Sequence, residues 1–253
     1  MRILAIAQNT FRESIRDKVL YVLLFFAAVT IFGSKALGWI SIGQDIKIVK
    51  DIALSATSIF GILIAIFVGT SLIYKEIDKR TLYTILAQPM HRYEFILGKY
   101  LGLVALLAVV TVTMALVSSL YILMLGGTLQ VTFFLAILLI YGKLLLITAF
   151  AVLMSSLTSP ILGAIIVFSV AVFGHATEVF RDLPPQFEGT SAKAILEAVY
   201  YVVPNLSNFD LAQEAANGIE VSGAYVIWVM AYGLLYTVML LILAALAFQE
   251  KDV

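Results

Sequence analysis

Apolar residues form six long, nearly uninterrupted stretches along this chain, each bordered by polar or charged positions. The stretches are 19–37, 52–74, 100–125, 131–154, 160–177 and 224–248. A helix needs about 20 apolar residues to cross the roughly 30 Å hydrocarbon core of a membrane. Because the runs are continuous and do not alternate with a period of two, they predict helices and not barrel strands. The pattern predicts an all-α polytopic membrane protein with six transmembrane helices, in a single domain over residues 1–253.

Composition supports a membrane protein and excludes several classes of site. Of the 253 residues, 62% are hydrophobic and 13% are charged, and the mean hydropathy is +1.04. A soluble domain carries about 25% charged residues. Sixteen Lys and Arg balance sixteen Asp and Glu, so no basic excess indicates a nucleic acid partner. The absence of cysteine excludes disulfides, thiolate nucleophiles and iron–sulfur or zinc–cysteine sites.

The distribution of Lys and Arg predicts the orientation in the membrane. These residues concentrate before the first stretch and in the loop 75–99, and short loops rich in Lys and Arg stay on the cytoplasmic side. We therefore expect a multi-pass protein of the cytoplasmic membrane with both termini cytoplasmic. The long loop 178–223 then lies outside. One interpretation of this loop is a solvated cap of short helices. The other is a functional surface, which either docks an extracytoplasmic partner or gates the exit.

The segment before the first stretch, residues 1–18, predicts an amphipathic helix. Its apolar residues with helical spacing are Leu4, Ala7, Phe11 and Ile15. Such a helix is typical of the membrane interface, and a merely solvated tail is the alternative. A cleaved signal peptide with residues 19–32 as its apolar region is disfavoured, because the preceding segment is too long and too patterned.

Enzyme signatures are missing from the sequence. It contains no G-x-S-x-G elbow and no G-x-x-x-x-G-K-[ST] loop. The two histidines, His91 and His175, are expected on opposite sides of the membrane and cannot share a metal ion. We expect no catalytic residues, no metal site and no bound cofactor in this chain. If the protein uses ATP, another polypeptide must bind it.

The loop 75–99 predicts a short amphipathic helix followed by a second one that leads into the third stretch. The apolar face of the first helix comprises Ile77, Thr81, Leu82, Ile85 and Leu86. Pro89 disfavours helical conformation at Gln88 and suits the first turn of a new helix.

This loop resembles the first cytoplasmic loop of the ABC-2 type transporter permeases. That loop has an acidic residue, a Thr-Leu pair, leucines, a proline, an arginine and a Gly-Lys pair. The matching residues here are Glu76, Thr81, Leu82, Leu86, Pro89, Arg92, Glu94, Gly98 and Lys99. The six stretches, the N-terminal helix and the long outer loop also fit, so the resemblance covers essentially the whole chain. Residues 200–206 resemble the outer-loop Pro-Asn segment of the multicopper-enzyme-maturation permeases.

The resemblance implies a membrane-spanning subunit, itself not an enzyme, of an ATP-binding cassette exporter. Its loop would be a coupling helix that docks on a separate ATPase subunit holding ATP and Mg. The residues expected to couple are Glu76, Ile77, Arg80, Thr81, Leu82, Ile85, Pro89 and Arg92. Two alternatives stay open: the loop lies on lipid headgroups, or the chain is a membrane scaffold or assembly factor without a transport cycle. An ion-driven transporter is disfavoured, because intramembrane carboxylates are scarce and no broken helix is evident.

Two features inside the stretches also suggest roles. Thr57, Gly61, Ala65 and Gly69 recur every four residues and form a small-residue face, which suits close helix packing within the chain, a dimer seam or a pathway. Because six spans make half of a two-lobed pore, we expect a second permease copy, as a homodimer or a related heterodimer.

Lys143 lies near the middle of its stretch, where it should face a protein interior or a wet cavity. Its role is either in the pathway or in a structural hydrogen bond. The sequence leaves the substrate open.

Overall fold

The computed structural model describes residues 2–38, 44–72, 92–176 and 203–249, and these ranges contain helices and connecting segments but no strand. The helices are α1 (Arg2–Ser14), α2 (Lys18–Gly38), α3 (Asp45–Ser71), α6 (Arg92–Met124), α7 (Val131–Leu157), α8 (Pro160–His175), the 3-10 turn η2 (Ser207–Phe209), α11 (Ala212–Asn217) and α12 (Gly223–Gln249). Within the described residues, α2, α3, α6, α7 and α12 are long and apolar enough to cross a membrane, whereas α8 is a shorter apolar helix. The expected all-α, polytopic fold is confirmed.

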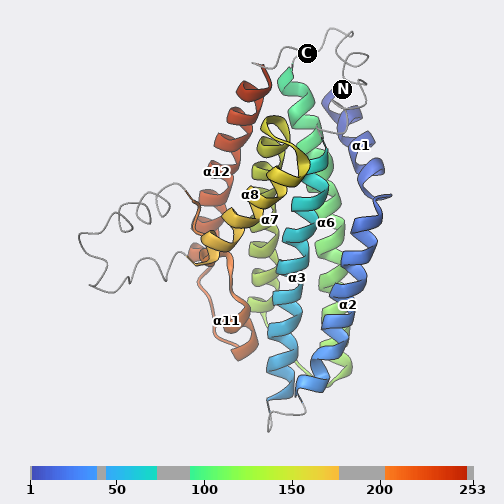
Figure 1. The fold of residues 1–253 in the computed structure, drawn as a ribbon. Helices are drawn as coiled ribbons and strands as arrows, with labels where there is room; N and C mark the ends of the chain where they lie inside the picture. The colour runs from blue at the N-terminus through green and yellow to red at the C-terminus, as the bar shows by residue number, and fades with distance from the viewer. Residues whose placement is uncertain (1, 39–43, 73–91, 177–202, 250–253) are drawn as a thin grey trace, which may run out of the picture.

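The long helices run side by side along one bundle axis (Figure 1). At one end of the bundle α1 begins, α6 begins and α12 finishes, and we call this the termini end. At the other, the far end, α6 passes into α7. Helix α7 lies at the centre and contacts α3, α6, α8 and α12. Its Leu144, Ile147 and Ala151 are completely buried, because a helix that is apolar on all sides can be enclosed by others.

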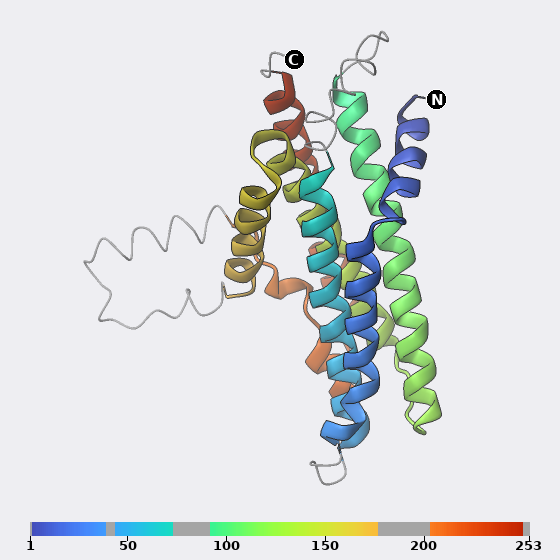
Figure 2. The ribbon, with the colours of Figure 1, turned by 45° about the vertical axis from the view of Figure 1, so that its right-hand side comes forward.

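Helix α1 packs against the first turns of α6 and leads down into α2 (Figure 2). A Cβ atom on Gly98 would lie 2.7 Å from Ile6, and one on Gly102 would lie 2.6 Å from Thr10. These glycines let the two helices approach closely. The buried residues of α1 are Thr10 and Ser14.

The face that α1 buries therefore differs from the apolar face predicted by the sequence. Leu4 is 76% exposed, whereas Phe11 and Ile15 are partly buried against the core. The close approach at the glycines of α6 rotates small polar residues inward and leaves Leu4 outside. The alternative of a merely solvated tail is wrong, because α1 is a packed helix.

Helix α8 ends about half-way along the bundle, as Figure 2 shows beside the longer α3. Its 16 residues extend about 24 Å at about 1.5 Å per residue, whereas 27 residues of α7 extend about 40 Å. The chain segment that begins at Val203 returns to this point: the amide of Leu206 donates to the carbonyl of Gly174 (2.9 Å) and the Ser207 hydroxyl donates to that of His175 (2.9 Å). These bonds satisfy carbonyls at a helix end inside the bundle.

This helix end corrects one expectation from the sequence. His175 lies level with the middle of α7, where it meets Lys143, and not near the outer surface. The reason is tertiary: a distant segment supplies the hydrogen bonds that let α8 stop there.

Candidate functional site

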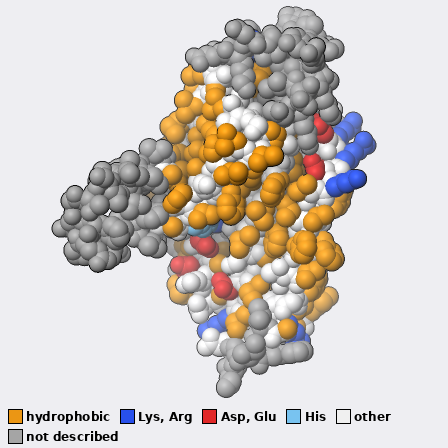
Figure 3. All heavy atoms as spheres, in the orientation of Figure 1, with side chains coloured by type: hydrophobic (Ala, Val, Ile, Leu, Met, Phe, Trp, Pro, Cys, Tyr) orange, Lys and Arg blue, Asp and Glu red, His pale blue; other side chains and the backbone are white. Residues whose placement is uncertain are grey.

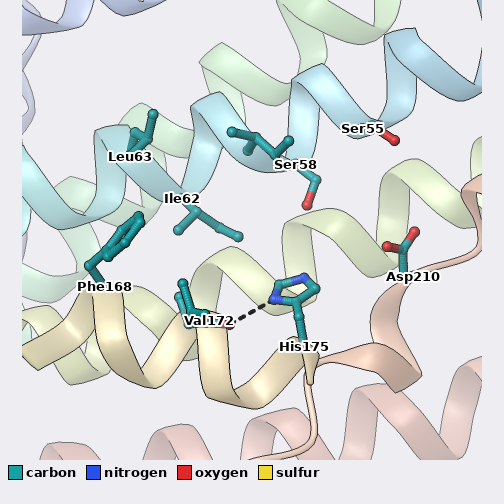
Figure 4. Close-up of a pocket in the computed structure, with 10 residues that line it drawn as sticks. Ser55, Ser58, Ile62, Leu63, Phe168, Val172, His175 and Asp210 are labelled. Atoms are coloured by element: carbon teal, nitrogen blue, oxygen red, sulfur yellow. Dashed lines mark hydrogen bonds between the residues drawn. The ribbon is translucent and has the colours of Figure 1, made fainter. Parts of the chain in front are cut away.

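A buried lysine and a histidine join α7 to the end of α8. Lys143, the thirteenth of the 27 residues of α7, is 0% exposed, and its Nζ lies 3.1 Å from Nε2 of His175. The other ring nitrogen, Nδ1, lies 2.8 Å from the carbonyl oxygen of Ala171 (dashed in Figure 4). Because a carbonyl only accepts, Nδ1 carries the proton and Nε2 accepts from the lysine ammonium.

Beside this pair lies a cavity of about 430 Å³ with mainly polar walls. It is lined by Asp51 and Ser55 of α3, His175 of α8, and Ser207, Asp210, Ala212, Gln213 and Glu214 of the returning segment. Asp210 is close enough to interact electrostatically with Asp51, Lys143 and His175. Figure 3 shows acidic and histidine side chains grouped on this face, below the apolar side chains of α8. The structure thus gathers charged groups from α3, α7 and residues 207–214 around the imidazole at the end of α8.

Two further cavities continue from this one between α3 and α8. The first, of about 380 Å³, shares Ser55, His175 and Asp210 with the polar cavity (Figure 4). The next, of about 430 Å³, shares Leu63 and Phe168 with the first and reaches Thr70 and Pro160 at the termini end. We call this continuous hollow, bounded by α3, α8 and residues 207–214, the α3–α8 groove. It changes from polar to apolar along its length.

The small-residue face of α3 points away from this groove and into the bundle. A Cβ atom on Gly61 would lie 2.8 Å from Leu144, and one on Gly69 would lie 2.7 Å from Ala151. Thr57 and Ala65 are buried as well. The face packs against α7 of the same chain.

The residues of α3 that line the groove were not among the site residues predicted from the sequence. Asp51, Ser55 and Ser58 recur with helical spacing, so their periodicity could have indicated a second face of α3. Nothing in the sequence indicated the depth of Asp210, because its place depends on the return of the chain beside α8.

Most of the predicted coupling residues lie outside the described part of the chain. These are Glu76, Ile77, Arg80, Thr81, Leu82, Ile85 and Pro89. Arg92, the first residue of α6, is described. Its Nη1 donates to the carbonyl of Phe248 near the end of α12 (2.7 Å), and its guanidinium lies 5.9 Å from the centre of that ring.

Within residues 2–38, 44–72, 92–176 and 203–249, no three His, Asp or Glu side chains group in a way that would hold a metal ion. What the groove offers instead is charge and hydrogen bonding for a molecule that enters it.

Comparison with known protein families places the chain. Residues 4–253 match the model of a family described as ABC-2 family transporter protein. No curated protein matches the chain.

Proposed function

Because the chain belongs to the ABC-2 family of transporter membrane proteins, we propose that it couples ATP hydrolysis by a separate ATPase subunit to export of a substrate. As a permease of this family, it is a transport subunit and not the catalytic one. ATP and Mg then belong to the partner. The match over residues 4–253 is the observation that carries the proposal, and the contacts around the start of α6 support it.

The first turns of α6 contact two other helices, so a movement of the preceding loop would reach all three. Arg92 and Phe95 both contact Phe248 of α12, the two rings being stacked 5.6 Å apart. Lys99 is 1% exposed, and its Nζ lies 3.9 Å from a carboxylate oxygen of Glu13 in α1. A docked ATPase that pushes on the loop 75–99 would therefore shift α1, α6 and α12 together. We infer that the apolar face with Ile77, Leu82 and Ile85 contacts the ATPase.

This function needs the termini end on the cytoplasmic side. The concentration of Lys and Arg before α2 and in the loop 75–99 supports that orientation. The start of α1, the start of α6 and the end of α12 at one end of the bundle agree with it. Both termini are then cytoplasmic, and α11 lies toward the outside.

A second permease copy would cover the α3–α8 groove. Asp51, His175 and Asp210 line it, and contact of carboxylates with lipid chains is unfavourable. Two copies with facing grooves would enclose a shared path between them, polar at the level of His175 and apolar toward Pro160. We propose this dimer, from one chain or from two related ones, as the translocating unit.

Within the family, the segment 200–206 supports a place among the multicopper-enzyme-maturation permeases. The Pro-Asn pair of this segment lies beside the end of α8, where Leu206 bonds to Gly174. The proposal concerns the subgroup only and not a metal cargo.

The experiment is affinity purification of the tagged chain from membranes in mild detergent, with identification and assay of co-purifying subunits. We expect a P-loop ATPase in stoichiometric amount, and we expect Leu82→Asp to lose it. Tyr83→Asp is the matched control, because residue 83 falls off the predicted apolar face.

Failure to recover an ATPase, under conditions that preserve other membrane complexes, would favour the scaffold or assembly factor. Equal recovery with both variants would show that a different surface binds the ATPase.

A further inference from the structure

The α3–α8 groove is polar at the level of His175 and apolar toward Pro160. We propose that it binds an amphiphile with a positively charged head, whose apolar chain lies between α3 and α8. This molecule is the substrate class of the transporter, so the inference rests on the function proposed above.

The polar end of the groove carries an excess of negative charge. Asp51, Asp210 and Glu214 line it, and Lys143 lies behind it with its ammonium directed to His175. When these groups are ionised and the histidine is neutral, three carboxylates against one ammonium leave two negative charges unbalanced. A cationic head compensates this excess, whereas an anionic head would increase the repulsion.

A serine hydroxyl near the carboxylates can bond a ligand. Ser58 is 7% exposed, and its hydroxyl points into the cavity on the side of His175 (Figure 4). Among the described residues it has no hydrogen-bond partner, whereas Thr57 and Thr70 of the same helix donate to carbonyls one turn earlier. The head of a ligand would supply that partner.

The apolar end suits a hydrocarbon chain. Leu63 and Phe67 of α3 face Ile161, Ile165 and Phe168 of α8 along it. Helix α8 extends about 24 Å, so an alkyl chain can lie along several of its turns. Burial of that chain supplies affinity without regard to the head, and the carboxylates then select the head by its charge.

The charge of the polar end explains why a neutral lipid is a poor occupant. Asp51, Asp210 and Glu214 line it beside the apolar part of the groove. Carboxylates next to hydrocarbon chains require compensation. A cationic head provides it and a neutral head does not.

The test uses the full chain in phosphatidylcholine vesicles and three photoreactive dodecyl probes. The probes carry the same diazirine-bearing chain and differ only in the head: trimethylammonium, hydroxyl or sulfonate. We expect saturable labelling of peptides from α3 and α8 by the trimethylammonium probe. Asp210→Asn and Asp51→Asn should each lower it roughly tenfold, which is the effect of losing one charge-assisted contact.

Two further variants separate the head from the chain. Ala164→Phe fills the apolar end and should lower labelling by all three probes. Glu220→Gln removes an exposed carboxylate outside the groove and should leave labelling unchanged.

Equal labelling by the three heads would overturn the charge preference. Unsaturable labelling spread over α2 and α12 would overturn the groove as the site. The labelling result and the ATPase result on the same preparation test different proposals. Recovery of an ATPase with head-independent labelling refutes only the amphiphile, whereas charge-selective labelling without an ATPase refutes transport and leaves a ligand site.

Discussion

The ammonium of Lys143 lies 3.1 Å from Nε2 of His175 and joins the middle of α7 to the last residue of α8. From the sequence, Lys143 was expected either in a pathway or in a hydrogen bond to neighbouring carbonyls. Its partner is instead a side chain that itself lines the α3–α8 groove. The lysine therefore does not line the groove itself but lies behind His175, where its charge balances part of the acidic charge of the groove.

Lys143→Met should destabilise the chain. The change removes the partner of His175 and a cation that interacts with Asp210. Leaving the partly buried imidazole of His175 without its hydrogen-bond partner costs about 1–3 kcal/mol. We expect the midpoint of thermal unfolding in detergent to fall by about 5–10 °C.

The double variant Lys143→Met, Asp210→Asn should recover part of this loss, because it removes both charges together. Lys47→Met, at an exposed position of α3, is the control and should change little. A full-strength defect in the double variant would contradict the electrostatic explanation.

Gly69→Ala should destabilise the contact between α3 and α7. Its new methyl group would start 2.7 Å from the Cβ atom of Ala151, and overpacking of this kind costs about 1–3 kcal/mol. Thermal unfolding of the purified variant measures it. Adding Ala151→Gly should restore stability by moving the methyl group to the other helix.

Gly33→Ala is the matched control, because a Cβ atom there would meet nothing within 4 Å. If the variants at residues 33 and 69 proved equally unstable, the cause would not be the α3–α7 contact.

Arg92→Ala should weaken coupling without preventing assembly. The variant loses the bond to the Phe248 carbonyl and the contact of the guanidinium with its ring. The link between α6 and α12 then rests on the stacking of Phe95 on Phe248 and is weaker. We expect the ATPase to co-purify in normal amount and its stimulation by the permease to fall several-fold. Arg12→Ala, at an exposed position of α1, should leave stimulation unchanged. Loss of the ATPase itself would instead place Arg92 in the docking surface.

Ser55→Cys should report the negative potential of the groove, since the natural chain contains no cysteine. Cationic thiol reagents should be favoured over anionic ones at residue 55, relative to Ser222→Cys, by roughly tenfold. Residue 222 is exposed and precedes α12. Asp210→Asn should shrink this ratio. An equal ratio at residues 55 and 222 would mean that the groove has no excess negative charge.

The spans could be predicted closely because each depends on local composition. The stretch 131–154 corresponds to α7 and the stretch 224–248 to α12. The stretch 160–177 was also recognised as apolar, but its helix ends at His175, half-way along the bundle. Its depth depends on bonds from Leu206 and Ser207, about thirty residues later. No local pattern encodes such a contact.

In the candidate site, too, some residues could be recognised from the local sequence and others could not. Lys143 stood out, because a lysine in the middle of an apolar run is rare. Asp51 and Asp210 did not, since each lies near the end of a span or in a connecting segment of the sequence.

What the sequence by itself determined is that this chain is a multi-pass helical membrane protein of the ABC-2 kind. Local hydrophobicity suffices for the helical membrane fold, because a backbone in hydrocarbon must satisfy its own hydrogen bonds in helices. The resemblance to the ABC-2 family came from the residues of the loop 75–99. Only the tertiary structure decided that Gly61 and Gly69 face α7, that His175 meets Lys143, and that Asp210 reaches the same groove. Each of these depends on which helix faces touch, and that is a property of the packed bundle and not of any single helix.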